Sequence, residues 1–230
     1  MEVSLGVAKI PKSGFRESGD SLETVERPRG GLSVIMADGQ GSGRPAKRLS
    51  SLVVAKAAAL IADGTRDGAC ARAVHDYLYS MREGKVLSTL VIVSVDLHTR
   101  SLIVSRNTAS PVLLDDRSKI TLLDQEVPSI GVNNMVKPHV TEVPLKEGLL
   151  CIGVSDGVAN AGRKYGERLD LDELIKLARG LEPYEAAGRM LDRAVRLDRG
   201  RPEGDMTVFV VGIGTGDGGL VRRIKITLPI

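Results

Sequence analysis

Four aspartates in this 230-residue sequence stand at the start or the end of an apolar run: Asp20, Asp38, Asp156 and Asp205. Carboxylates that are gathered in one place repel one another and are costly to desolvate unless a cation compensates them. Oxygen ligands without His or Cys favour a hard cation such as Mg²⁺ or Mn²⁺. Two such ions, about 3.5–4 Å apart, can bridge a hydroxide and clamp a phosphoryl group for in-line attack.

Two of these aspartates are followed by glycine, and Asp-Gly is also a common hairpin turn. The chain contains five Asp-Gly pairs. Those that begin at Asp63, Asp67 and Asp217 are predicted to be turns or helix ends. Taken singly, Asp38 and Asp156 remain open to the same interpretation, so the metal hypothesis depends on all four aspartates meeting in space.

The stretch around Asp38 predicts a buried strand, a turn and a helix. Residues 32–37 are apolar and include β-branched residues, which favours a strand. Glycines at 39, 41 and 43 then allow a tight turn, and Pro45 suits the first turn of a helix. Residues 149–155 predict a second buried strand that delivers Asp156.

The remaining pattern alternates runs of strands with pairs of helices. Strands are predicted at residues 3–10, 20–25, 90–96, 101–105, 111–115, 119–123, 140–145, 206–213 and 220–228. Helices are predicted at 49–61, from a cap at Thr65 through 81, at 171–179 and from Pro183 onward. Asp170 and Glu173 form a capping-box-like start for the helix at 171–179. This order is not the strict βα alternation of a doubly wound fold. It predicts an α+β fold: a four-layer αββα sandwich of two antiparallel sheets flanked by helix pairs.

Composition limits the classes of partner and compartment. The net charge of +3 is small and the basic residues alternate with acids, which argues against nucleic acid as a partner. Two separated cysteines, Cys70 and Cys151, predict buried thiols and a reducing, cytoplasmic location. With no signal peptide or bilayer-spanning run, no membrane association is expected. Residues 1–230 are predicted to form one catalytic domain without a fused sensor.

Four short motifs, in this order along the chain, carry a resemblance to a known family. They are Ser18-Gly-Asp-Ser21, Ala37-Asp-Gly-Gln-Gly-Ser-Gly43, Val154-Ser-Asp-Gly157 and Gly204-Asp-Met-Thr-Val208. Together they resemble the motifs of metal-dependent Ser/Thr protein phosphatases of the PPM type, and more narrowly the bacterial SpoIIE/RsbX branch. The resemblance spans nearly the whole chain, and the family's β-sandwich agrees with the predicted layers.

The resemblance implies specific roles for these residues. Asp38 would bridge two Mn²⁺ or Mg²⁺ ions, with the Gly39 carbonyl and Asp20 on one ion. Asp156 and Asp205 would hold the other, which makes Asp38 and Asp156 the central catalytic residues. A metal-bound hydroxide would be the nucleophile, without a phosphoenzyme. Stand-alone members of the branch act in stress signalling, which implies phosphorylated STAS-domain proteins as substrates.

One position departs from the family pattern. The family usually has an acid where this chain has Gly204, with Asp205 one residue later and Glu203 one residue before. Either Asp205 reaches the metal after a backbone adjustment, or the second metal site is weakened. This departure motivates the alternative of a catalytically weak or silent phosphoprotein-binding module.

Other candidates are weaker. Arg44 and Arg16 could contact a substrate phosphate, but solvated surface arginines are the simpler interpretation. His75 is predicted to lie at the surface or to be partly buried, and no histidine is assigned a catalytic role. A nucleotide-binding enzyme is the third hypothesis, because glycines follow the strand that ends at Asp38. Their spacing is G-x-G-x-G, whereas the dinucleotide fingerprint is G-x-G-x-x-G, which argues against it.

Overall fold

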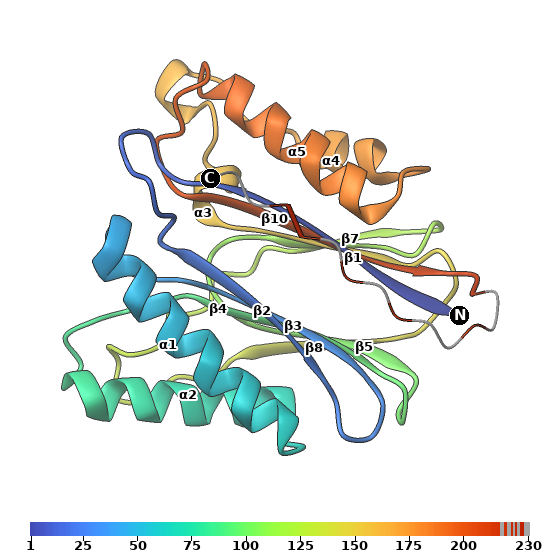
Figure 1. Ribbon diagram of the computed structural model, residues 1–230, viewed down its shortest axis with the longest axis horizontal. Helices are drawn as coiled ribbons and strands as arrows, with labels where there is room; N and C mark the ends of the chain where they lie inside the picture. Colours follow the sequence, from blue (N-terminus) through green and yellow to red (C-terminus); the bar gives the residue numbers. More distant parts are fainter. Residues whose placement is uncertain (217–218, 220–221, 223, 225, 228–230) are drawn as a thin grey trace.

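The computed structural model describes residues 1–216, 219, 222, 224, 226 and 227, and within them the chain forms four layers (Figure 1). Two five-stranded antiparallel sheets pack face to face, with helices on both outer surfaces. The predicted αββα sandwich is confirmed.

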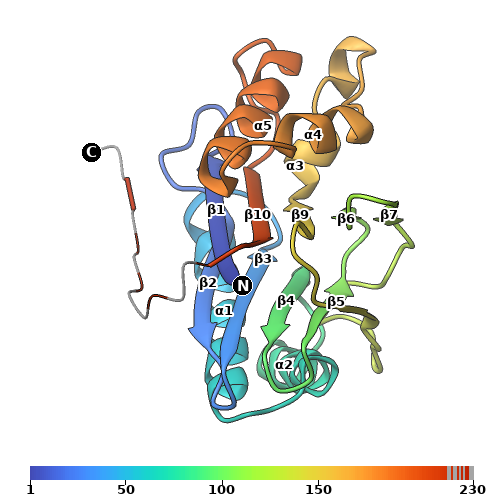
Figure 2. The ribbon, with the colours of Figure 1, turned by 90° about the vertical axis from the view of Figure 1, so that its right-hand side faces the viewer.

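The first sheet, sheet A, is ordered β1-β10-β9-β6-β7. Its strands are β1 (Glu2–Ile10), β6 (Val112–Asp115), β7 (Ile120–Leu123), β9 (Leu150–Val154) and β10 (Met206–Gly214). The second, sheet B, is ordered β2-β3-β4-β5-β8. Its strands are β2 (Asp20–Glu26), β3 (Gly31–Asp38), β4 (Leu90–Asp96), β5 (Ser101–Asn107) and β8 (His139–Pro144). Figure 2 shows the two sheets from a second side.

Helices cover the outer face of each sheet. Sheet B carries α1 (Gly43–Ala62) and α2 (Asp67–Arg82). Sheet A carries α4 (Leu171–Ala178) and α5 (Pro183–Leu197), with the short α3 (Asp156–Ala159) and the 3₁₀ turn η1 (Arg163–Tyr165) on the way to them. Among the described residues, none of the helices has the length and apolar character that crossing a bilayer requires.

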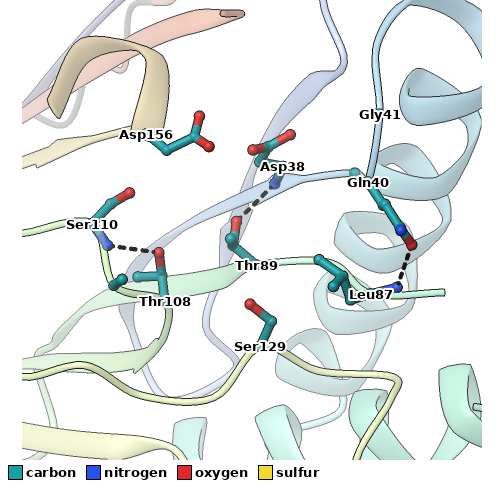
Figure 3. A pocket seen from close by; sticks show the side chains of 11 residues that line it. Asp38, Gln40, Gly41, Leu87, Thr89, Thr108, Ser110, Ser129 and Asp156 are labelled. Atoms are coloured by element: carbon teal, nitrogen blue, oxygen red, sulfur yellow. Dashed lines mark hydrogen bonds between the residues drawn. The ribbon is translucent and has the colours of Figure 1, made fainter. Parts of the chain in front are cut away.

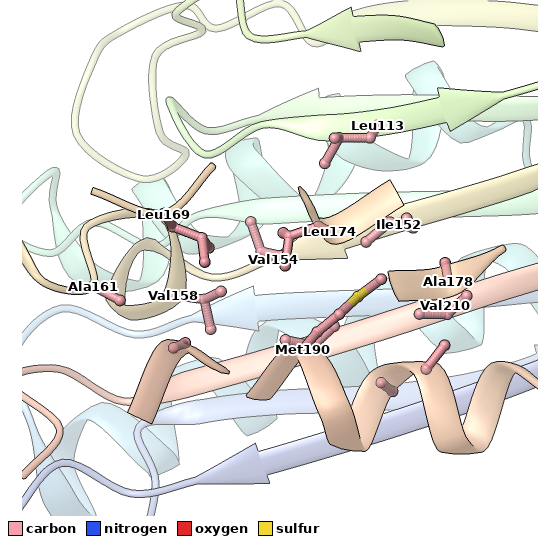
Figure 4. Close-up of a cluster of buried hydrophobic side chains, with 14 of the residues drawn as sticks. Leu113, Ile152, Val154, Val158, Ala161, Leu169, Leu174, Ala178, Met190 and Val210 are labelled. Carbon is pink, nitrogen blue, oxygen red and sulfur yellow. The ribbon is translucent and has the colours of Figure 1, made fainter. Parts of the chain in front are cut away.

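Three apolar clusters hold the layers together. One lies between α4, α5 and sheet A, where Met190 of α5 belongs to the same cluster as the strand residues Ile152 and Val210 (Figure 4). A second fills the space between the sheets and includes Phe209, and a third lies under α1 and α2. The strands β3, β4, β5, β6, β9 and β10 are buried along most of their length, which explains their nearly continuous apolar sequences, whereas β1, β2, β7 and β8 are more exposed.

Alternation along β3 decides where Asp38 points. Ile35 and Ala37 pack under α1 and α2, whereas Val34 and Met36 belong to the cluster between the sheets. Successive side chains of a strand point to opposite faces. Asp38 therefore shares the inner face and lies at the end of the sandwich core.

Two sequence expectations about the helices are wrong, and a third is confirmed. The N-cap of α2 is Arg66 instead of Thr65, which accordingly lies in the link between α1 and α2. His75 is 2% exposed, and its Nδ1 accepts a hydrogen bond from the Gly131 N–H, so the expectation of a surface or partly buried position is wrong. The Asp170 cap of α4 is confirmed, because its side chain accepts from the Asp172 N–H.

Two further expectations concern the cysteines and the end of the chain. Cys70 and Cys151 are buried free thiols, as predicted. The predicted strand at residues 220–228 and the Asp217-Gly218 turn lie largely outside the described residues.

Candidate metal centre

Strand register brings Asp20 and Asp38 face to face. Asp20 begins β2, Asp38 ends β3, and the two are direct partners in the antiparallel ladder. Directly opposed residues point to the same face of a sheet, with their Cβ atoms about 5 Å apart. Asp20 is fully buried, and Asp38 is partly exposed at the mouth of a pocket.

The other two aspartates come from neighbouring strands of sheet A. Asp156 follows β9 as the first residue of α3, and Asp205 immediately precedes β10. The pair is fixed by Ser155, whose hydroxyl donates to the Asp205 carbonyl at 3.1 Å and accepts from the Thr207 N–H at 2.9 Å. Because β9 and β10 are antiparallel, the end of one lies beside the start of the other.

A hydrogen bond joins the two halves across the sandwich. The Thr207 hydroxyl on β10 donates to Oδ2 of Asp20 on β2 at 2.5 Å. The Oδ2 of Asp205 also lies against Gly19, only 2.8 Å from where a Cβ would stand on that glycine. The structure therefore places all four aspartates at the same end of the sandwich, as the sequence predicts.

The carboxylates disfavour one another's charged form. Burial raises the pKa of Asp38 to about 8, and the charges of the other three aspartates add to the effect. Burial likewise raises the pKa of Asp20 to about 7, against the opposing hydrogen bond from Thr207. The pKa of Asp156 is also raised, mainly by burial. A positive charge placed among these groups would favour ionisation of all of them.

Protein cations do not supply that charge at the carboxylates themselves. Lys9 and Lys47 both donate to the main-chain carbonyl of Asp20, at 3.2 and 3.1 Å. In the described part of the chain, none of the four aspartates forms an ion pair. The Oδ1 atom of Asp20 is buried and finds no hydrogen-bond partner in the described part of the chain. This orphaned oxygen and the oxygen-only donors fit a hard divalent cation.

The grouping is looser than a formed ligand cage. Within the described ranges, no three Asp, Glu, His or Cys side chains are close enough together to enclose one ion. The carboxylates thus lie around a common region, but their oxygens are too far apart to bind one ion together as they stand. Binding an ion there requires small side-chain adjustments that draw their oxygens inward.

The structure distinguishes the two acids beside Gly204. Asp205 is 7% exposed, adds its charge to those acting on Asp20 and Asp38, and accepts from the Lys12 N–H through Oδ1. Glu203 instead points outward to Lys164, 2.6 Å away. Asp205 is therefore the acid that lies with the cluster.

Glycine is required where α1 approaches the site. A Cβ on Gly39 would lie 2.2 Å from the Ala46 carbonyl oxygen in the first turns of α1. The tight glycine turn predicted from sequence is thus needed for the helix to reach the end of β3.

A cavity of about 350 Å³ opens beside these residues (Figure 3). Asp38, Gly39 and Asp156 line one side of it, and hydroxyl side chains line the other. Arg44 is outside it: its side chain is 81% exposed and pairs with Glu17. Arg16 is exposed as well.

Sequence reasoning missed the polar residues that fix the aspartates. Ser155 and Thr207 stand inside two of the motifs, but sequence reasoning assigns them no role there, because their hydrogen bonds depend on strand pairings that local sequence does not specify. Thr89, whose hydroxyl accepts from the Asp38 N–H at 3.0 Å, gives no signal in its own sequence context.

Comparisons with known proteins agree with this arrangement. The family model described as Stage II sporulation protein E (SpoIIE) matches residues 28–214. Stage II sporulation protein E of Bacillus subtilis (strain 168) is 28% identical over 214 residues, or 92% of this chain and 26% of that protein. The Priestia megaterium protein of the same name is 25% identical, over 90% of this chain and 36% of its own length. The chain therefore spans about a quarter to a third of these relatives.

Solved structures show the same fold. The PP2C phosphatase domain of SpoIIE from Bacillus subtilis, solved with a fragment of its regulatory domain, has a TM-score of 0.80 and 27% identity, covering 93% of this chain and 64% of that one. The catalytic domain of the serine/threonine phosphatase PstP, solved with two manganese ions, has a TM-score of 0.72 and 17% identity, covering 93% of this chain and 99% of that one. The latter likeness concerns the fold alone. From the matched family model, the ordered aspartates and this fold, we conclude that the chain belongs to the SpoIIE family and has the architecture of PPM serine/threonine phosphatases.

Proposed function

We propose that this chain is a protein serine/threonine phosphatase domain that requires two Mn²⁺ or Mg²⁺ ions and acts in the cytoplasm. The observation that carries the proposal is the meeting of four aspartates beside a pocket, with one buried carboxylate oxygen left unpaired. Family membership supports the phosphatase activity, since the SpoIIE relative of known structure is described as a phosphatase. We further propose that residues 1–230 act as one catalytic domain.

The proposed roles follow from position. Asp38 and Asp156 line the pocket, so their carboxylates would hold the ions on the side where a substrate enters. The Thr207 hydroxyl donates to Oδ2 of Asp20, whereas Oδ1 has no hydrogen-bond partner among the described residues, so Oδ1 would be available to hold an ion. The Gly39 carbonyl and Asp205 would complete the ligands. When bound, two such ions supply an activated water and neutralise charge on the phosphoryl group.

A direct test uses the purified protein with p-nitrophenyl phosphate and a phosphoserine peptide. We expect hydrolysis that depends on Mn²⁺ or Mg²⁺, and a loss of at least about 100-fold in kcat/KM for Asp38→Asn. Asp116→Asn is a suitable control, since Asp116 belongs to a surface turn that contacts Ser118 and Lys119. Turnover that is unaffected by Asp38→Asn would contradict the proposed role of this residue.

As the physiological substrates we propose phosphorylated STAS-domain signalling proteins. The support is limited to family likeness and to one structural neighbour of 19% identity, whose description concerns the bacterial stressosome. The test is to incubate the enzyme with phosphorylated STAS proteins of its own organism and with unrelated phosphoproteins. Equal rates on both sets would count against the assignment.

A silent phosphoprotein-binding module is the second candidate, motivated by Gly204 in place of an acid. It predicts binding of a phosphopeptide without turnover with any divalent ion. The burial of Asp205 among the other aspartates favours the enzyme, because an acid is still present at this end of β10.

A further inference from the structure

The wall of the pocket that faces the aspartates consists of small hydroxyl residues. Thr108 and Ser110 lie in the loop between β5 and β6, and Ser129 lies in the segment that follows β7. Figure 3 shows Thr108 and Ser129 across the pocket from Asp38 and Asp156, with Ser110 at the side of the pocket just below Asp156. The ion site and this wall therefore enclose the same space from two sides.

The hydroxyl protons of this wall are free to donate. The Oγ1 atom of Thr108 accepts from the Ser110 N–H at 2.9 Å, so its own proton is left for another acceptor. The hydroxyls of Ser110 and Ser129 form no hydrogen bond with any other described residue. Neither oxygen is among the buried atoms that lack a partner, so both remain accessible from the pocket. A ligand rich in acceptor oxygens would satisfy all three groups.

A buried arginine turns the carbonyls of the wall away from the pocket. The Nη2 atom of Arg106 donates to the carbonyls of Thr108 and Ser110, each at 3.3 Å, and to that of Gln125 at 3.0 Å. Asn107 ties the two segments together by donating to the Pro128 carbonyl. The wall is thus held rigid, with donors facing inward and acceptors facing Arg106.

Arg106 also places a positive charge directly behind the hydroxyls. Its side chain is fully buried, and its Nε and Nη1 atoms have no hydrogen-bond partner among the described residues. Such a charge is weakly screened and acts over a longer range than a solvated one. Lys, Arg and His are all missing from the described residues that line the pocket. An anion in the pocket would meet neutral donors, backed by this buried cation.

We propose that Thr108, Ser110 and Ser129 form the subsite that binds the phosphoryl oxygens of the substrate, with Arg106 as the positioning residue of the subsite. This inference rests on the proposed function and deepens it. The subsite would recognise a phosphate monoester through its phosphoryl group, whatever the attached alcohol. It would therefore contribute equally to the binding of a small aryl phosphate, a phosphopeptide and inorganic phosphate.

The test compares Ser110→Ala, Thr108→Val and Thr108→Ser with the control Thr121→Val on β7, whose side chain lies outside this pocket. We expect Ser110→Ala and Thr108→Val each to raise KM for p-nitrophenyl phosphate and Ki for inorganic phosphate about 3- to 10-fold, with little change in kcat. Thr108→Ser should restore the wild-type values, since it keeps the hydroxyl. Mn²⁺ affinity, measured by calorimetry, should stay unchanged throughout.

The outcomes separate this subsite from the proposed function. Unchanged KM and Ki in both hydroxyl variants, or a loss confined to the phosphopeptide, would overturn the subsite. If the wild-type protein shows no metal-dependent turnover, the proposed function fails, and calorimetric titration of inorganic phosphate into the Mn²⁺-treated protein still decides the subsite. Weaker phosphate binding by Ser110→Ala than by Thr121→Val supports it, and equal binding overturns it.

Arg106→Lys and Arg106→Met test the positioning role. Lysine keeps the positive charge and N–H donors but loses the planar fork of the guanidinium, whereas methionine removes both the charge and the donors. We expect a larger rise of KM and of the phosphate Ki in Arg106→Met than in Arg106→Lys, with both variants confirmed as folded by circular dichroism. Folded variants with wild-type KM and Ki would overturn the role of Arg106.

Discussion

At the level of single residues, the site gathers aspartate carboxylates whose negative charges repel one another, and this repulsion lowers the stability of the folded protein. Asp20 and Asp38 oppose each other in a ladder, an arrangement in which like charges destabilise a sheet. Their raised pKa values express that cost. Divalent cations that bind the ionised carboxylates would offset this cost in free energy.

The raised pKa values predict how the stability of the metal-free protein depends on pH. With pKa values of about 7 for Asp20 and about 8 for Asp38, the folded state holds protons that unfolded carboxyl groups, with pKa near 4, release. The free energy of unfolding should therefore fall as the pH rises from about 4 to about 8. We expect a lower Tm at pH 8.5 than at pH 6 in EDTA, measured by thermal unfolding.

One variant and one ligand serve as controls for this pH dependence. Asp38→Asn removes one of the protons concerned and should flatten the trend. Added Mn²⁺ should raise Tm most at the higher pH, where the carboxylates are ionised. A metal-free Tm that rises between pH 6 and 8.5 would contradict the crowding of these carboxylates.

The two acids beside Gly204 offer a matched pair. Asp205 lies in the cluster, whereas Glu203 pairs with Lys164 at the surface. We expect Asp205→Asn to weaken Mn²⁺ binding by at least about 10-fold, and Glu203→Gln to leave it unchanged. Isothermal titration measures both. The reverse order would show that Glu203 supplies the missing ligand.

At the level of elements, strand register accounts for the site better than any motif does. The strand and helix pattern, the glycine turn after Asp38 and the α4 cap could be predicted because each depends on local sequence. The partnership of Asp20 with Asp38 and the Thr207 bond to Asp20 could not, because they join segments far apart in the chain. His75 was misplaced for a related reason: its Gly131 partner comes from a distant loop.

The link between α2 and sheet B is a buried ionic network. Arg27 on the β2–β3 hairpin pairs with Asp67 in the first turn of α2 and with Asp96 at the end of β4, at 3.3 and 3.4 Å. Ser94 donates to the same Asp67 carboxylate. Burial raises the pKa of Asp67, so its charged form depends on these partners.

Removal of one partner should therefore be costly. We expect Arg27→Met to lower the free energy of unfolding by about 3 kcal/mol, because Asp67 would be left buried without its cation. Arg29→Met, at an exposed position of the same hairpin, should change it by less than about 0.5 kcal/mol. Urea denaturation measures both values. Equal effects of the two variants would refute the network's role in docking α2.

At the level of the whole molecule, the sandwich is a rigid frame that places two motifs from each sheet at one end. With 3% aromatic residues and no Trp, the composition predicts an aliphatic core, yet Phe209 belongs to the described cluster between the sheets. Its side chain is fully buried between the sheets, and a Cβ on Gly153 would lie 2.1 Å from its ring. The ring thus occupies the space that the glycine on β9 leaves open.

The two phenylalanines of the chain form a natural comparison. Phe209→Ala should lower the free energy of unfolding by about 3–5 kcal/mol, because it leaves a cavity between the sheets. Phe15 is 43% exposed, and Phe15→Ala should cost less than about 1 kcal/mol. Chemical denaturation with matched m-values checks both. A small loss for Phe209→Ala would mean that the sheets do not share a close-packed core.

The claim on which the whole account depends is that this end of the sandwich binds paired divalent cations. Anomalous diffraction from a crystal of the protein soaked in MnCl₂ tests it most directly. We predict two manganese peaks about 3.5–4 Å apart, with Asp38 between them, Asp20 and Asp156 on either side, and Asp205 as a ligand in place of an acid at position 204. The absence of manganese from this site at saturating concentration, or peaks that leave Asp38 and Asp156 uncoordinated, would contradict the account.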